Sequence, residues 1–271
     1  MRDENQLPAT PVEQMIVYAA RLLDDWSVVA AGTQWPLVAS LLAKSLHAPH
    51  VTICYEGGVV LGKVPDRVPI LTGDPAHNSS SVLLGDAFDG LGMIIHAGRA
   101  DITMISGASM DRFGNVNTTC IGDYHFPQLR FGGSGGACDF GSLSKTIIIM
   151  EHDKRRFPER VDFITTPGFL NGKNGREEAG LRPNTGPYAV VTTLGLFHFD
   201  ENGELTLSAY HPSSSVAEVK ENVQWDLKVR EDVHPLAPPT QMELEVLRNH
   251  IDPQGVYLKQ RRFFIGKEII F

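Results

Sequence analysis

Cysteine is scarce in this chain, and its three cysteines, Cys54, Cys120 and Cys138, form no C-x-x-C pair. Three thiols cannot build the disulfide framework of a small secreted protein, and without paired spacing they do not predict a structural zinc site. We therefore expect a protein that holds no metal and works in a reducing compartment, the cytoplasm.

Cationic residues are also few: the chain has 24 Lys and Arg but 32 Asp and Glu, which gives a net charge of −8. Binding to nucleic acid needs clustered cations, and the dense basic runs at 154–156 and 259–262 are short, so no nucleic-acid partner is expected. Long apolar runs are absent as well, because 147–150 is far shorter than the roughly 20 residues of a membrane helix. The polar start, MRDENQLPATP, lacks the apolar core of a signal peptide, so no membrane partner is expected.

The 42% of hydrophobic residues suffices for a folded core and excludes intrinsic disorder. Apolar residues recur at helical spacing over 11–25 and 35–46, and short apolar segments at 28–31 and 51–55 indicate buried strands. Alternation of helices with such strands predicts a parallel sheet covered by helices. More strands of this style are predicted at 102–105, 146–150, 161–164 and 188–192.

The C-terminal third has a different pattern. Strand-like segments at 195–199 and 204–208 flank an Asn-Gly turn, which predicts a hairpin. Short helices are predicted at 216–222 and 240–249, the second with a Thr240/Glu243 capping box. With no repeat and no break in composition, we predict one α/β domain over 1–271: an open, mostly parallel sheet sandwiched by helices, with a C-terminal extension whose tail is 258–271.

Glycines gather in the segment GGSGGACD at 132–139. Such a loop lets a backbone approach a ligand, and its N–H groups bind an anion or a developing oxyanion, unless it is only a flexible connection. It is not a Walker A loop, because no Gly-Lys-Ser/Thr follows, and it fits a dinucleotide fingerprint only loosely.

A second candidate is Glu56, which follows the strand at 51–55 and precedes Gly57-Gly58. Ligands of open α/β sheets bind at the carboxyl ends of strands, so this carboxylate is either a nucleophile or base, or an ordinary loop residue. The polar segment 106–127 is typical of a lid or a site wall. Cys138, beside the glycine loop, and Cys54, in a predicted buried strand, are weaker candidates for a nucleophile.

Four motifs follow one another in this chain: a strand with Glu56-Gly57-Gly58, then SGASMDRFGNVNTTCIGDYH, GGSGGACDFGS and EHDKRRFPERVDFITTPGF. In this order they resemble the β subunits of family I coenzyme A transferases, and among them the glutaconate CoA-transferase type. The resemblance runs from about residue 28 to 257. It departs from the family in Ser106-Gly107-Ala108-Ser109, where Gly-Gly-Ala-Gln is frequent, and in the Gly-Gly after Glu56, both of which bear on acyl specificity.

The resemblance implies a function. Glu56 would attack the thioester of a donor acyl-CoA, and a glutamyl-CoA thioester would then pass CoA to a short (di)carboxylic acid such as glutaconate, with ping-pong kinetics. The loop Gly133, Ser134, Gly135, Gly136 and Ala137 would border the acyl site, with N–H groups of Gly135 and Gly136 at the oxyanion. Further substrate-binding candidates are Gln34, Arg99, Asn117, Tyr124 and His125.

The resemblance also implies a partner and alternatives. Coenzyme A enters as acyl-CoA substrate, and an α subunit would carry most of its binding surface, in an assembly of two α and two β chains. Relatives of this fold act as hydrolases that open rings of CoA thioesters or as decarboxylases, so the alternatives are hydrolysis, C–C cleavage or decarboxylation with Glu56 as base. A third is a non-catalytic subunit that completes a partner's site.

Overall fold

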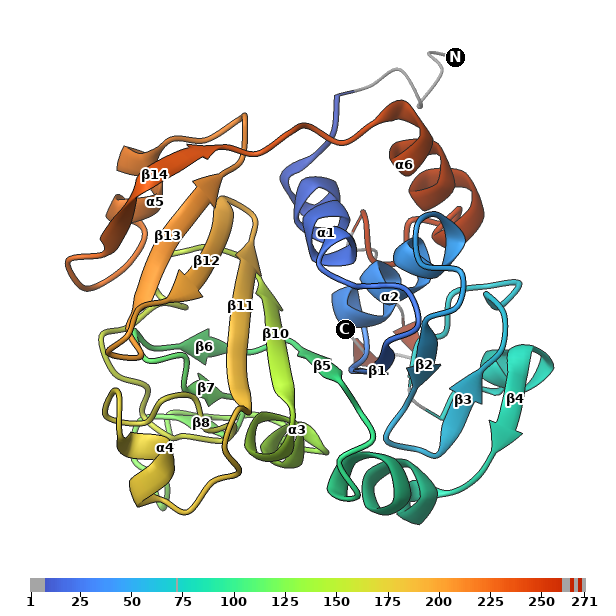
Figure 1. Cartoon of the computed structure of the whole chain (residues 1–271), viewed down its shortest axis with the longest axis horizontal. Helices are drawn as coiled ribbons and strands as arrows, with labels where there is room; N and C mark the ends of the chain where they lie inside the picture. Colours follow the sequence, from blue (N-terminus) through green and yellow to red (C-terminus); the bar gives the residue numbers. More distant parts are fainter. Residues whose placement is uncertain (1–7, 72, 260–263, 266–267, 270–271) are drawn as a thin grey trace.

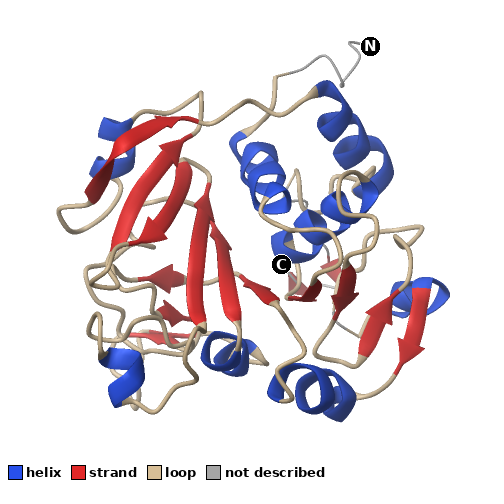
Figure 2. Ribbon diagram, viewed as in Figure 1, coloured by secondary structure: helices blue, strands red, loops and turns tan. Residues whose placement is uncertain are grey.

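A ten-stranded sheet runs through the chain in the order β14-β13-β12-β11-β10-β5-β1-β2-β3-β4. The computed structural model describes residues 8–71, 73–259, 264–265 and 268–269. Figure 2 shows the strands as a band across the molecule with helices on its flanks. The strands of this sheet are β1 Val28–Ala31, β2 Thr52–Cys54, β3 Val59–Leu61, β4 Ser81–Leu84, β5 Ile102–Ile105, β10 Lys145–Met150, β11 Gly186–Thr192, β12 Gly195–Phe199, β13 Leu205–Tyr210 and β14 Lys228–Pro235.

The centre of the sheet is parallel. Strands β2, β1, β5, β10 and β11 pair side by side in one direction. Toward one edge β3 and β4 add antiparallel pairs, and toward the other β12 and β13 do so, with β14 at the edge parallel to β13. The central strands are nearly continuous apolar runs because both of their faces are covered. The predicted fold class, a mostly parallel sheet between helices, is therefore confirmed.

Alternate residues of these strands enter two different cores. Ile147 and Ile149 of β10 belong to the core that the sheet forms with α1 and α2 on one face. Ile148 and Met150 belong to a second core on the opposite face. Figure 1 shows α1, α2 and α6 gathered on one side and α3 near the ends of β10 and β11. The helices are α1 Pro11–Arg21, α2 Trp35–Ser45, α3 Ala137–Leu143, α4 Gly175–Glu178, α5 Val216–Glu221, α6 Gln241–Glu245, the 3₁₀ helix η2 Pro75–Ser80 and the π-helical η3 Phe88–His96 and η4 Val246–Ile251.

Short two-residue strands lie outside the large sheet. The pairs β6–β7 and β8–β9 lie between β5 and α3 and shape the polar segment 106–127. Most of the predicted tail 258–271 lies outside the described residues, apart from 258–259 and the small β15–β16 pair. These short strands are β6 Ser109–Met110, β7 Val116–Asn117, β8 Cys120–Ile121, β9 Leu129–Arg130, β15 Phe264–Ile265 and β16 Glu268–Ile269.

Most predicted elements are present within a few residues of their expected bounds, including the hairpin β12–β13 and the capping box of Thr240 and Glu243. The predicted strand at 161–164 was wrong. This segment is a partly exposed surface loop that contacts the β8–β9 connection: Asp162 accepts a hydrogen bond from Gly122 N–H, and Phe163 stacks on Tyr124. Phe163 thus serves that contact, while both edges of β10 are already paired by β5 and β11.

The chain order reverses at β1, which has β2 on one side and β5 on the other. The carboxyl ends of β1, β2 and β5 therefore meet at a topological switch point, the usual place of ligand sites in open α/β sheets. No helix among the described residues combines the length and the apolar character needed to cross a bilayer.

Two histidines lie buried in the sheet region beside Thr192. The Nδ1 atom of His152 is 3.1 Å from Thr192 Oγ1, and Nε2 of His211 is 2.7 Å from the Thr192 carbonyl oxygen. Burial lowers the pKa of each to about 4. The neutral imidazole is thus the form that the folded protein accommodates.

We predict that these histidines make the protein less stable in mild acid. In the unfolded chain they take up protons below their ordinary pKa of about 6.5, whereas the folded chain does so only near pH 4, so the free energy of unfolding falls between these values, by roughly 2 kcal/mol per histidine at pH 5. Urea titrations at pH 7.5 and 5.0 measure this. His211→Gln should lose about half of the histidine contribution. The exposed-site control His234→Gln should keep all of it, and an equal pH dependence in all three proteins would contradict the prediction.

Candidate active site

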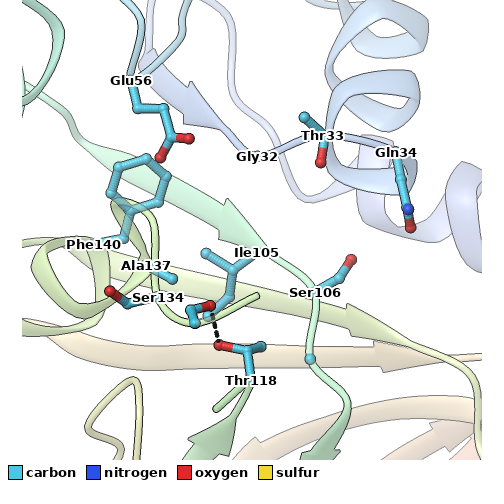
Figure 3. A pocket seen from close by; sticks show the side chains of 12 residues that line it. Gly32, Thr33, Gln34, Glu56, Ile105, Ser106, Thr118, Ser134, Ala137 and Phe140 are labelled. Carbon is cyan, nitrogen blue, oxygen red and sulfur yellow. Dashed lines mark hydrogen bonds between the residues drawn. The ribbon is translucent and has the colours of Figure 1, made fainter. Parts of the chain in front are cut away.

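The ends of three parallel strands enclose a cavity of about 330 Å³. β1 leads into 32–34, β2 into Glu56 and β5 into 105–107, and the opposite wall comes from Thr118, the glycine loop and α3 (Figure 3). Of the lining residues, only Glu56 carries a charge. The complete lining is Gly32, Thr33, Gln34, Glu56, Ile105, Ser106, Gly107, Thr118, Gly133, Ser134, Ala137 and Phe140.

Glu56 lies on the tight turn between β2 and β3. Gly58 N–H donates to the Tyr55 carbonyl oxygen at 3.0 Å, and Gly58 has a φ of 89°, which suits glycine. Helix η3 packs directly on this turn, because a Cβ on Gly90 would lie 2.6 Å from the carbonyl oxygens of Tyr55 and Glu56. Glycine at both positions lets the two backbones touch, and this contact fixes the place from which the Glu56 side chain starts.

The glycine loop holds the other end of that side chain. Gly136 N–H donates a hydrogen bond of 2.7 Å to Glu56 Oε2. A Cβ on Gly136 would lie 2.7 Å from the same oxygen, and one on Gly135 would lie 3.4 Å from both carboxylate oxygens. The loop itself is anchored by Thr118, whose carbonyl oxygen accepts from Gly133 N–H and whose hydroxyl donates to the Gly133 carbonyl oxygen.

The polar segment after β5 forms a wall of the cavity through Ser106, Gly107 and Thr118. Its interior is held by Asn115 and the buried Asp111. Burial raises the pKa of the Asp111 carboxyl, against hydrogen bonds from Asn115 and Phe113 that act in the opposite direction. These contacts are structural, and they fix the residues that face the cavity.

Several predicted site residues come together here: Glu56, Gln34, Gly133, Ser134 and Ala137 line the cavity, and Gly135 and Gly136 contact the Glu56 carboxylate. Their chemical roles stay predictions.

The other four candidates do not line the cavity. Asn117 is buried, and its side chain bonds to the backbone of Thr119 and Cys120. Tyr124 and His125 lie on the exposed β8–β9 connection, with their rings edge to face, and Arg99 is exposed after η3.

Neither cysteine candidate lines the cavity. Cys54 is buried in β2 with its thiol 3.4 Å from the Val29 carbonyl oxygen, and burial raises its pKa to about 12. A thiol with that pKa stays protonated and is a poor nucleophile. No cluster of three or more His, Cys, Asp or Glu that could hold a metal ion occurs in the described part of the chain.

Sequence reasoning named Ser106 only within the motif Ser106-Gly107-Ala108-Ser109 and Thr118 only within the polar segment 106–127, and it did not name Phe140 at all. Ser106 directly follows a predicted strand that neighbours the strand before Glu56, so the position of that strand's carboxyl end was the available signal. The signal for Thr118 was its place in the polar segment 106–127, which was expected to be a lid or a site wall. Phe140 carried no comparable signal, because its place at the cavity depends on how the loop folds back.

Comparisons with known proteins identify the family of this chain. Residues 12–222 match the family model described as coenzyme A transferase. The chain belongs to the coenzyme A transferase family. Over 256 residues it is 38% identical to the B-type subunit of glutaconate CoA-transferase from Acidaminococcus fermentans, covering 92% of this chain and 95% of the relative. The crystal structure of glutaconate coenzyme A-transferase from that organism superposes with a TM-score of 0.87 at 37% identity, covering 92% and 97% of the two chains.

Two more relatives of this coenzyme A transferase chain carry different names. The B-type subunit of 3-oxoadipate CoA-transferase from Pseudomonas knackmussii is 36% identical over 241 residues, which are 87% of this chain and 91% of the relative. The cholesterol ring-cleaving hydrolase IpdB subunit of Mycobacterium tuberculosis is 25% identical over 253 residues, which are 92% of this chain and 97% of the relative. The relatives thus include proteins named as CoA-transferase subunits and one named as a hydrolase subunit.

We predict that Gly136→Ala reduces CoA-transferase activity by at least about tenfold, because the new methyl group would displace the Glu56 carboxylate from its N–H donor. Gly132→Ala is the matched control in the same loop, since nothing lies within 4 Å of a Cβ placed there. The measurement is kcat/KM of the assembled enzyme together with the thermal midpoint. Equal activity of both variants would contradict the assigned contact.

Proposed function

We propose that this chain is the B-type subunit of a CoA-transferase that moves CoA from an acyl-CoA donor to a short dicarboxylic acid, with Glu56 as the nucleophile. The observation that carries the proposal is a carboxylate held in a cavity whose other lining residues are neutral. The names of two relatives, a glutaconate and a 3-oxoadipate CoA-transferase, support a dicarboxylic substrate.

The proposed reaction begins when a Glu56 oxygen attacks the thioester carbonyl. The C–S bond breaks, CoA leaves as a thiolate, and an acyl-glutamyl anhydride forms. The thiolate then attacks the Glu56 carbonyl, the donor acid leaves as a carboxylate, and Glu56 carries CoA as a thioester. The acceptor carboxylate runs these steps in reverse and leaves as acyl-CoA, which restores Glu56. Each step exchanges one activated acyl bond for another, so the transfer needs no ATP.

The hydrogen bond from Gly136 N–H gives this scheme a specific electrostatic element. In the resting protein it orients one carboxylate oxygen and leaves the other to attack. If the bonded oxygen becomes the carbonyl oxygen of the anhydride, thiolate attack turns it into the oxyanion, and the N–H group is already in place. A fixed donor of this kind costs no reorganisation at the moment of reaction.

We predict that Glu56→Ala, Glu56→Gln and Glu56→Asp each abolish CoA transfer, because the first two remove the nucleophile and the third moves it away from the cavity. The matching substitutions of the exposed Glu201 should leave the rate unchanged. Transfer is measured with the co-purified partner, and retained activity in Glu56→Ala would overturn the assignment.

A chemical trap separates a nucleophile from a base. Incubation with acyl-CoA and no acceptor, then borohydride or hydroxylamine, should modify a peptide containing residue 56 in the wild type and in no Glu56 variant. A wild-type enzyme that hydrolyses or decarboxylates the acyl-CoA without modification at this peptide would instead assign Glu56 as a base, as in the hydrolase alternative.

We infer that an A-type subunit completes the site. No Lys or Arg lines the cavity in the described part of the chain, yet CoA is polyanionic. Beside the Glu56 turn, the edge strand β4 and η3 expose Val82, Leu84 and Phe88, with 74%, 59% and 71% of each residue accessible. Apolar surface of this kind on an edge strand is typical of a protein interface.

We predict that Phe88→Asp weakens association with the A-type partner at least about tenfold, because a charge replaces an apolar contact in the interface. Met242→Asp is the control, since Met242 is 60% exposed on α6, on a different part of the surface. Co-purification of tagged chains and sedimentation measure the complex. Unchanged association of the Phe88 variant would place the interface elsewhere.

A further inference from the structure

The side-chain hydroxyl of Ser106 makes no hydrogen bond to any described residue. Ser106 follows β5 at the switch point and lines the cavity, and its hydroxyl oxygen is shielded from solvent. A buried hydroxyl without a partner is unfavourable, because it has lost its water and gained nothing in exchange. Rotation of this hydroxyl toward the cavity would let it donate to an acceptor oxygen of a ligand, which would remove that penalty.

Gln34 shows a second unusual feature on the same side of the cavity. It joins β1 to α2 with φ 65° and ψ −128°, a conformation that favours glycine and strains any other residue. Its side-chain amide lines the cavity and bonds to no other described residue. Gly32 N–H bonds to the Met104 carbonyl oxygen, so the strand ends that carry Gln34 and Ser106 are fastened together. A strained glutamine with a free amide is best explained by a use for its side chain.

Figure 3 shows the Gln34 amide and the Ser106 hydroxyl across the cavity from the Glu56 carboxylate. Thr33, beside Gln34, adds a further hydroxyl to this wall. The wall thus offers neutral hydrogen-bond donors at a distance from the reacting carboxylate. A carboxylate accepts several such bonds at once, and bonds to an ionised acceptor are stronger than neutral ones. An apolar acyl tail would leave these donors without partners, and sites of this kind reject ligands that lack the acceptor.

We propose that Gln34 and Ser106 bind the distal carboxylate of the acyl group and so select dicarboxylic over monocarboxylic substrates. The inference rests on the proposed transfer reaction and adds the subsite that sets its substrate class. The first carboxyl carbon reacts at Glu56, while the second carboxylate lies against the donors at the ends of β1 and β5. Placement at the opposite wall also keeps it away from the negative charge of Glu56.

The test compares glutarate with butyrate as CoA acceptors in the assembled enzyme. Ser106→Ala should lower kcat/KM for glutarate about tenfold or more, mainly through KM, and leave kcat/KM for butyrate unchanged or raised. Ser106→Thr keeps the hydroxyl and should retain most of the selectivity. Ser79→Ala, at an exposed serine, is the control that should change neither value.

Gln34 permits a sharper version of the same test. Gln34→Gly removes the side chain and suits φ 65°, so it should keep or raise the thermal midpoint while losing selectivity for glutarate. Gln34→Glu is nearly isosteric and should lower glutarate transfer further through repulsion. A purely structural glutamine would give a lowered midpoint and an unchanged ratio of glutarate to butyrate transfer.

The outcomes separate this inference from the proposed function. Trapping of CoA on Glu56 from acetyl-CoA should succeed in every Ser106 and Gln34 variant, because acetyl has no distal group. Trapping with an unchanged glutarate-to-butyrate ratio would overturn the subsite alone, as would an equal fall for both acids. Absence of trapping in the wild type would overturn the transfer mechanism.

Discussion

The site depends on one constraint: the backbones of two segments, η3 and the glycine loop, must come within contact distance of Glu56. Gly90 of η3 touches the carbonyl oxygens of the Glu56 turn, and Gly136 both touches the carboxylate and donates to it. Any side chain at these two positions would push the elements apart. The glycines therefore hold a charged group in a fixed geometry with close packing and one hydrogen bond, and with no cation lining the cavity in the described part of the chain.

That arrangement has a consequence for assembly. In the function we propose, Glu56 is an available nucleophile because no cation lines its cavity in the described part of the chain. The same lack of cations would leave a polyanionic CoA substrate without a counter-charge at this cavity. The exposed apolar side chains of β4 and η3 lie on the elements that pack on the Glu56 turn, so a partner docked there would adjoin the cavity. Under the proposed docking, binding of the partner and formation of the complete site would be linked through η3 and the turn that it packs on.

Much of the fold could be predicted because its signals are local. The β-branched runs of β1, β5 and β10 and the capping box at Thr240 depend on near neighbours, and the structure has them at the expected places. The segment 161–164 has the same apolar look but became a loop, since both neighbours of β10 in the sheet were already supplied. The composition of a segment indicates that it could form a strand. Whether it does so depends on the full pairing pattern, because a strand needs a neighbouring strand whose edge is unpaired.

The sequence by itself determined the family and the fold class, a mostly parallel α/β sheet. It also identified Glu56 and the glycine loop as the candidate catalytic residues. Short motifs in a fixed order carry this information. Tertiary structure alone decided which polar residues share the cavity. Gln34 and Ser106 are brought to one wall, whereas Arg99, Tyr124 and His125 lie elsewhere and Asn117 supports the backbone. The physical reason is that cavity lining depends on strand order at the switch point and on how loops fold back, and neither is written in the spacing of residues along the chain.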